Sequence, residues 1–90
     1  MSDYKEYTVI VYANGYKSWY LNGKRHREDG PAEEYANGDK CWCLNGKRHR
    51  EDGPAVEYAN GGKCWLLNDI KLQCENDKEF QSIMKMRAFL

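Results

Sequence analysis

Short runs of alternating apolar and polar residues fill the first two thirds of the chain, and Asn-Gly pairs separate them. Strict alternation over four or five residues is typical of a half-buried β-strand. An Asn-Gly pair between two such runs indicates a β-hairpin, because these residues readily adopt the positive φ angles of a tight turn. The pattern predicts a mainly β antiparallel meander of three repeated hairpins, with strands near residues 8–12, 17–21, 32–35, 40–44, 55–58 and 63–67.

The same 23-residue pattern, YANGxKxWxLNGKRHREDGPAxE, occurs twice, over residues 12–34 and 35–57, with differences at four positions. A third, degenerate copy spans residues 58–74 and begins YANGGKCWLLN. A period of about 20 to 50 residues is typical of stacked supersecondary units, each of which buries its apolar face against the next. The repeat therefore predicts a short stack of hairpins rather than a single enzyme fold.

The alternation also assigns residues to the two faces of the sheet. If each hairpin turn is two residues long, Val56 lies opposite Trp65, and one face collects the same aromatic residues from each copy. The expected structural core consists of Trp19, Trp42, Trp65, Tyr35 and Tyr58. The opposite face carries residues that vary between copies, among them Ser18, Tyr20, Cys41 and Cys43. A three-residue turn would shift this assignment by one position.

The third copy departs from the pattern after Asn68, where DIKLQCENDKEF replaces the expected connector. Asn76 followed three residues later by Glu79 forms a capping box, and apolar residues then recur at helical spacing. We therefore expect a C-terminal helix, with its cap, over residues 76–89, which closes the end of the stack over the tryptophans. One helix of this length covers only part of a face, so apolar surface should remain open for an interface.

Composition favours a single domain, residues 1–90, in which 14 basic and 14 acidic side chains cancel. A neutral chain lacks the global field that draws proteins to nucleic acids or anionic membranes. Residues 1–16 lack the features of a signal peptide, and no run is apolar enough to span a bilayer. We expect a cytoplasmic protein, in the host cytoplasm if virally encoded, with no membrane partner.

The four cysteines raise the question of disulfides or a metal site. Cys41, Cys43 and Cys64 occupy strand positions that are not cysteine in the first copy, so a framework of bridges is not expected. Their spacing, with Cys74, does not match a zinc knuckle, and Cys41 and Cys64 should lie about 10 Å apart, two strands from one another. We expect small buried apolar side chains, no metal and no cofactor.

Each of the two full copies carries a KRHR tetrad followed at once by Glu-Asp. The residues expected to contact a partner are these basic side chains and two variable-face tyrosines: Lys24, Arg25, Arg27, Lys47, Arg48, Arg50, Tyr16 and Tyr20. In a stack, Arg27 should lie near Glu51 or Asp52 of the next copy. His26 and His49 should be loop residues bonded to neighbouring carboxylates, because no nucleophile recurs beside them.

The pattern YANGxKxWxLNGKxH at a 23-residue period, from residue 12 to about residue 68, resembles MORN repeats. The resemblance implies a single-layer antiparallel sheet of successive hairpins with a scaffold or recognition role and no catalysis. One departure is that His26 and His49 are followed by Arg-Glu-Asp, whereas many MORN copies have Gly there. The tandem HREDGPA segments also look like those in small proteins of phages and large viruses.

These observations favour a non-enzymatic protein-binding module whose target is a host macromolecular complex. The viral likeness adds a narrower hypothesis, a phage or mobile-element protein that inhibits a host defence factor by occlusion, as anti-CRISPR proteins do. One alternative is a nucleic-acid-binding module that uses the two KRHR loops. Another is self-assembly, as a homodimer or a longer array, through the unpaired strand edges of the stack.

Overall fold

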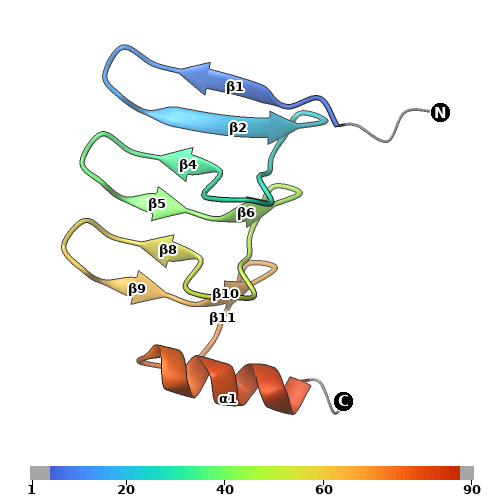
Figure 1. Cartoon of the computed structure of the whole chain (residues 1–90), viewed down its shortest axis with the longest axis vertical. Helices are drawn as coiled ribbons and strands as arrows, with labels where there is room; N and C mark the ends of the chain where they lie inside the picture. The colour runs from blue at the N-terminus through green and yellow to red at the C-terminus, as the bar shows by residue number, and fades with distance from the viewer. Residues whose placement is uncertain (1–4, 88–90) are drawn as a thin grey trace.

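Three tiers of hairpins stack in one direction, with a helix beyond the third tier, in this computed structural model of residues 5–87 (Figure 1). The molecule measures 41 × 38 × 17 Å, so it is broad and thin, as expected of a stack without a second sheet packed face to face. The predicted antiparallel meander of hairpins with one C-terminal helix is confirmed.

Within the described residues, short strands precede a single helix in the order β1 (Thr8–Val11), β2 (Lys17–Leu21), β3 (Lys24–Arg25), β4 (Glu33–Glu34), β5 (Lys40–Cys41), β6 (Cys43–Leu44), β7 (Lys47–Arg48), β8 (Val56–Glu57), β9 (Lys63–Cys64), β10 (Leu66–Leu67), β11 (Ile70–Lys71) and α1 (Asp77–Arg87). The main sheet has the order β1-β2-β4-β5-β8-β9, and β3 pairs with β2. The small hairpins β6-β7 and β10-β11 form separate two-stranded sheets.

The first turn of each copy is longer than two residues, so the predicted register is wrong. Val56 pairs with Cys64, not with Trp65. In the third copy the Tyr58 N–H donates to Gly62 O at 2.8 Å, which leaves a three-residue loop, and Gly61 takes a φ of 94°. The Asn60 side chain stabilises this loop by accepting the Gly62 N–H at 2.9 Å. Asn-Gly therefore ends a bulged turn here instead of forming the whole turn.

The second Asn-Gly pair of each full copy, and Asn68-Asp69 in the third, form the tight hairpin that the first pair does not. Asn45 and Gly46 have φ angles of 53° and 83°, as a two-residue type I′ turn requires. These turns create β3, β7 and β11, strands of two residues each that the hydrophobic pattern did not reveal. The predicted strand 40–44 is interrupted at Trp42, whose N–H bonds to Ala55 O and whose C=O accepts the His49 N–H.

The corrected register places different residues on the two faces of the main sheet. One row, in direct cross-strand contact, runs Ile10, Ser18, Glu33, Cys41, Val56 and Cys64. The neighbouring row alternates in charge along Lys17, Glu34, Lys40, Glu57 and Lys63, which suits a solvated face. The buried cluster consists of Ala32, Cys41, Cys43, Ala55, Val56 and Leu66, so the face expected to be variable carries the core.

The tryptophans and tyrosines of the predicted core separate into different environments. Trp65 is buried, with 4% of its surface exposed, whereas Trp19 and Trp42 are half-buried. Tyr35 and Tyr58 are exposed at 43% and 46%, so their assignment to the core is wrong. They occupy the start of the bulged turns, where a side chain leaves the sheet.

The helix α1 begins and packs largely as the sequence predicts. The Asn76 side chain accepts the Glu79 N–H at 2.9 Å, and the Glu79 carboxylate accepts the Glu75 N–H at 2.7 Å. Its buried Phe80 packs against Trp65, with ring centroids 6.4 Å apart. The predicted helical residues 88 and 89 lie outside the described part. The helix lies beyond the last tier and packs on Trp65, so it covers only part of the stack, as its length led us to expect, and Trp19 and Trp42 do not lie beneath it.

Candidate functional site

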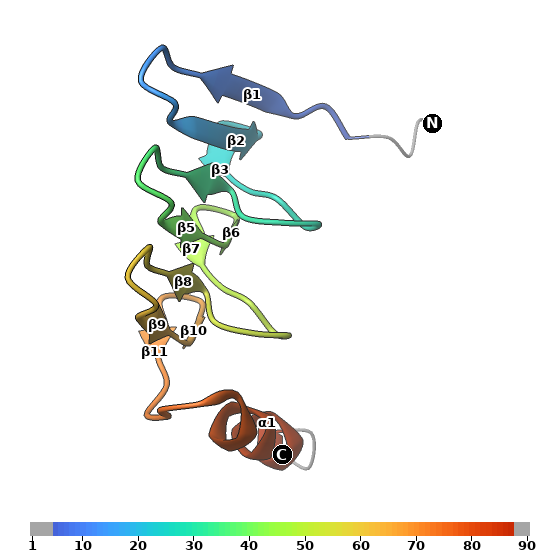
Figure 2. The ribbon, with the colours of Figure 1, turned by 60° about the vertical axis from the view of Figure 1, so that its left-hand side comes forward.

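The connectors between tiers project from one side of the stack as two long loops (Figure 2). In each connector the last arginine of the tetrad turns inward. Arg27 lies over the Trp19 ring at 4.1 Å and Arg50 over the Trp42 ring at 4.0 Å. Each guanidinium also binds a carbonyl of its own loop, as Arg50 binds Pro54 O at 3.1 Å. These two predicted contact residues therefore hold the connectors in shape.

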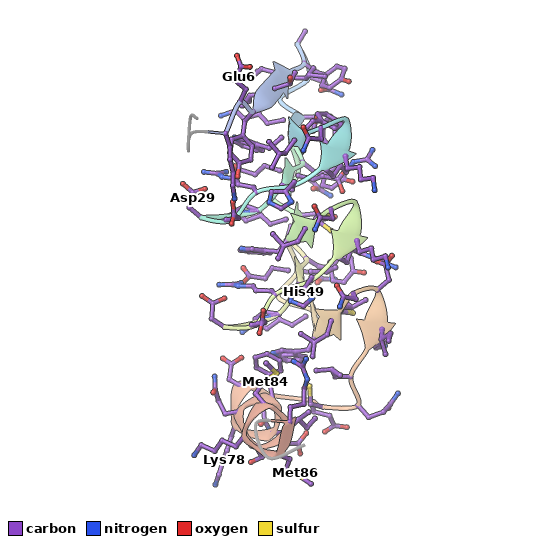
Figure 3. All side chains as sticks on the ribbon, turned by 90° about the vertical axis from the view of Figure 1, so that its right-hand side faces the viewer. Glu6, Asp29, His49, Lys78, Met84 and Met86 are labelled. Carbon is purple, nitrogen blue, oxygen red and sulfur yellow. The ribbon has the colours of Figure 1, made fainter. Side chains whose placement is uncertain are left out.

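The ion pairs of the connectors form within a copy. Arg27 binds Asp29 at 2.9 Å and Glu34 at 3.3 Å, so the prediction that it pairs with Glu51 or Asp52 is wrong. The loop closes on itself because Arg27 precedes Gly30 and Pro31, which turn the chain back over the guanidinium. Asp29 is left at the outer tip of the first connector, as Figure 3 shows.

The remaining basic residues of the tetrads lie on the small hairpins. Lys24 and Lys47 are exposed there. Arg25 pairs with Glu33 at 3.0 Å, and Arg48 pairs with Asp69 at 3.4 Å. The basic side chains of each tetrad thus point in different directions, and the exposed tips of the connectors are acidic.

The two histidines join one tier to the next. His26 is 7% exposed, and its Nδ1 accepts the backbone N–H of Asn45 at 2.9 Å. His49 is 9% exposed and accepts the N–H of Asn68 at 3.0 Å, while its Nε2 lies 3.1 Å from Glu51. The expected carboxylate neighbour is present, but the main bond of each ring is to the turn of the following copy. Sequence reasoning missed this joint, although the third copy carries Leu72 where no tier follows.

Tyr16 belongs to an aromatic row along the first turns. Its ring lies 5.2 Å from that of Tyr12 and 4.9 Å from that of Tyr35. Its hydroxyl donates to Glu33 at 2.6 Å, and Tyr35 donates to the same oxygen at 3.1 Å. Tyr20 is half-buried, with the Arg25 guanidinium 5.9 Å from its ring. Both predicted tyrosines therefore lie close to Glu33 or its partner Arg25.

Glu33 is the centre of a polar cluster in the buried row. The residue is only 8% exposed, and its carboxylate lies beside the thiols of Cys41 and Cys43. Burial and Glu33 raise the pKa of both Tyr16 and Tyr35, so these hydroxyls remain donors. The hydrogen bond between the thiols raises the pKa of Cys41, which is also buried, and lowers that of Cys43.

The other candidate surface is the free edge of the main sheet at β1. Its exposed fractions are 47% for Val9, 37% for Ile10 and 63% for Val11, and Tyr12 follows at 46%. An open groove of about 580 Å³ continues from this strand, lined by Lys5, Tyr7, Val9, Trp19, Arg27, Glu28 and Asp29.

Glu28 of the first connector binds two residues that line the groove beside β1. Glu28 accepts from Lys5 Nζ at 2.6 Å and from the Tyr7 hydroxyl at 2.9 Å, contacts that lower the pKa of Glu28. The segment before β1 is thereby tied across the connector, and among residues 5–87 no strand pairs with the other side of β1.

Comparisons with protein-family models, with curated proteins and with solved structures find no match to this chain. Over residues 5–87, the one helix present has 11 residues and falls short of the length and apolarity that crossing a bilayer would need.

Proposed function

We propose that this chain is a non-enzymatic protein-binding module that pairs β1 with an extended segment of a partner protein. The observation that carries the proposal is the exposed, apolar edge strand Thr8–Val11 at the end of the main sheet. Such edges are usually protected by lysine, proline or a bulge, because they add further strands readily. None of these features interrupts β1, whose sequence is TVIV.

The backbone of β1 has free groups in the direction that strand addition needs. Tyr12 donates its N–H to Tyr16 O at 2.8 Å, and bonded pairs alternate along an antiparallel ladder. Counting back from this bond, Ile10 is hydrogen-bonded to β2, and Val9 and Val11 are not. The N–H and C=O groups of Val9 and Val11 therefore point away from β2, where a partner strand can bind them.

A single substitution at β1 tests the proposal. Val11→Pro removes one outward N–H and leaves the bonds to β2 intact, and proline is tolerated on edge strands. Wild-type protein used as bait in a host lysate should recover a stoichiometric partner that Val11→Pro fails to recover. The matched control, a Lys24→Ala and Lys47→Ala double variant, should retain the partner. Equal recovery by Val11→Pro, with an unchanged circular dichroism spectrum, would refute strand addition.

Two further measurements separate this proposal from the alternatives. Light scattering that shows a dimer for the wild type and a monomer for Val11→Pro would mean that β1 pairs with a second copy instead. A gel shift of labelled DNA or RNA at low salt, weakened by Arg25→Ala and Arg48→Ala, would favour the nucleic-acid alternative.

The narrower proposal is that the partner is a host defence factor and that binding occludes it. Its support is the likeness of the tandem HREDGPA segments to those of small phage and viral proteins. Phage plating efficiency on a host with an active immune system should rise when the wild type is expressed and stay at baseline with Val11→Pro. An equal rise with both would refute a role for β1 in inhibition.

A further inference from the structure

The two full copies differ at only four positions, and the structure brings residues from those positions together where the first copy meets the second. Tyr16 and Glu33 come from the first copy, and Cys41 and Cys43 come from the second. Tyr16 donates to Glu33, and the Glu33 carboxylate lies within 4.8 Å of both sulfur atoms. Differences at unrelated surface positions would be expected to scatter. Here they gather around one buried carboxylate and two buried thiols.

The spacing of the two sulfur atoms suits a shared metal ion. Cys41 and Cys43 are two residues apart, and their Sγ atoms lie 3.7 Å from each other. Two thiolates bound tetrahedrally to zinc, with Zn–S bonds of about 2.3 Å, place their sulfur atoms about 3.8 Å apart. A carboxylate oxygen completes a set of three protein ligands on one side of such an ion, which leaves a fourth position open.

The carboxylate of Glu33 is fixed in the way that a metal-binding carboxylate usually is. One oxygen, Oε2, accepts hydrogen bonds from the Tyr16 and Tyr35 hydroxyls at 2.6 and 3.1 Å and forms an ion pair with Arg25 Nε at 3.0 Å. Among residues 5–87, no hydrogen bond engages the other oxygen. Outer partners of this type orient a ligand and tune its basicity. Oε1 therefore remains available to an ion.

A second, independent feature lies beside Glu33 on the same face of the sheet. Ser18 pairs directly with Glu33 across the sheet, as Glu33 pairs with Cys41, so the three side chains lie side by side on one face. The Ser18 side chain is fully buried, yet its hydroxyl has no hydrogen-bond partner among the described residues. Buried hydroxyls are nearly always paired, often with water. A water on the open position of a bound ion would supply that partner.

The charges also balance. Two thiolates and one carboxylate carry a charge of about −3, which a divalent cation and the Arg25 guanidinium neutralise together. This set differs from the four-cysteine site that the sequence argues against, since Cys64 and Cys74 are absent and Glu33 is present.

We propose that Glu33, Cys41 and Cys43 bind one thiophilic divalent cation of the zinc class, with a fourth position open to water or to a ligand from a partner. Binding would fasten β4 to β5 and β6, because Glu33 lies on β4 and the two cysteines lie on β5 and β6. The proposal does not depend on strand addition at β1.

Titration of the reduced, full-length protein with Co²⁺ tests the site directly, because thiolate ligands give Co²⁺ an intense near-ultraviolet band. We expect one equivalent to bind and Zn²⁺ to displace it. Cys41→Ser and Cys43→Ser should each lower the affinity by more than about 100-fold, and Tyr16→Phe by about 10-fold. Glu33→Gln should weaken binding but keep the thiolate band.

Cys64→Ser and Cys74→Ser are the matched controls and should bind Co²⁺ as the wild type does. Circular dichroism of each variant confirms that the fold is retained. Absence of a one-to-one complex with the reduced wild type at micromolar protein would overturn the proposal. So would unchanged affinity in Cys43→Ser, or an equal loss in Cys64→Ser.

Discussion

The second and third copies share the same hairpins and differ in what covers their tryptophan. Trp42 is covered by Arg50 of its own connector, at 4.0 Å, and remains half-buried. Trp65 has no arginine to cover it, and Phe80 of α1 takes that place and leaves only 4% of Trp65 exposed. A guanidinium can cover a ring while staying solvated, so it suits a copy with tiers on both sides. The end of the stack uses an apolar cover instead.

The same two copies also differ at the joint to a following tier. His49 reaches the turn of the third copy through the Asn68 N–H, at 3.0 Å. The equivalent residue of the third copy is Leu72, which keeps the bond from its own N–H to Trp65 O at 2.8 Å. Histidine therefore occurs where a tier follows and leucine where the helix follows. The difference identifies the imidazole as a connector between copies.

Removal of the Phe80 ring, which covers Trp65 at the end of the stack, should have the largest effect on stability. Phe80→Ala should lower the free energy of unfolding by about 3–5 kcal/mol, because a fully buried ring that covers Trp65 is lost. Urea denaturation followed by tryptophan fluorescence measures this change. Met86→Ala is the matched control, since Met86 is 70% exposed on the far side of the helix and its loss should change stability by less than about 0.5 kcal/mol. An equal effect of the two substitutions would show that α1 does not cap the stack.

Replacement of a histidine that joins two copies by leucine, the residue at the equivalent position of the third copy, should have an intermediate effect on stability. His49→Leu leaves the Asn68 N–H without its acceptor and should cost about 1–2 kcal/mol in the free energy of unfolding. His26→Leu should behave alike, because His26 bonds to Asn45 in the same way. Hydrogen exchange of the Asn45 and Asn68 amides, followed by NMR, should show faster exchange only at the amide whose acceptor is removed. Unchanged exchange at both would contradict the proposed joint.

A smaller effect on stability is expected when the arginine that covers a tryptophan is replaced by lysine, which keeps the charge but lacks the planar guanidinium. Arg50→Lys removes the planar group from the face of Trp42 and should lower the free energy of unfolding by about 0.5–1 kcal/mol. Thermal denaturation compared with Arg27→Lys checks whether both inner covers contribute alike. A variant as stable as the wild type would mean that the arginine is not needed to cover the ring.

The smallest effect concerns the turn of the third copy, where Asp69 replaces the Gly46 of the second. The Arg48 N–H donates to Asp69 at 2.8 Å and lowers the pKa of Asp69 below its ordinary value of 3.8. A carboxyl group whose pKa is lower in the folded state than in the unfolded state stabilises the fold at pH values above its unfolded pKa. This stabilisation is lost as the pH falls through the folded pKa. Between pH 5 and pH 2, wild-type stability should therefore fall more steeply than that of Asp69→Gly. Parallel curves would contradict this role.

The sequence predicts the hairpins well but not the turn each Asn-Gly pair forms. At residues 60 and 61 the pair ends a bulged loop that the Asn60 side chain stabilises, whereas at 45 and 46 both residues adopt positive φ. The dipeptide alone is compatible with both turns, and the difference of one residue exchanges the faces of the sheet. That is why Glu33, Cys41 and Val56 could not be recognised as one buried row.

The site residues were predicted in part, for a related reason. The sequence shows that the KRHR tetrads are basic. It does not show that Arg50 turns inward, because that depends on the position of Trp42 beside its own connector. The four positions that differ between copies were visible in the sequence. Their convergence was not, because it requires the register between one copy and the next.

The close contact between the turns of successive tiers, here called the seam, bears on how such a chain can change length. A Cβ added at Gly15 or at Gly38 would meet the Cβ of Ala36 or Ala59 at 3.3 Å, so the turns of successive copies lie almost in contact. Gly61 faces open space, because no further turn follows it. The two seams are equivalent, and each is completed within 23 residues of sequence. Duplication or deletion of one whole 23-residue unit should therefore preserve the contact between turns, whereas an insertion or deletion of another size should disrupt it.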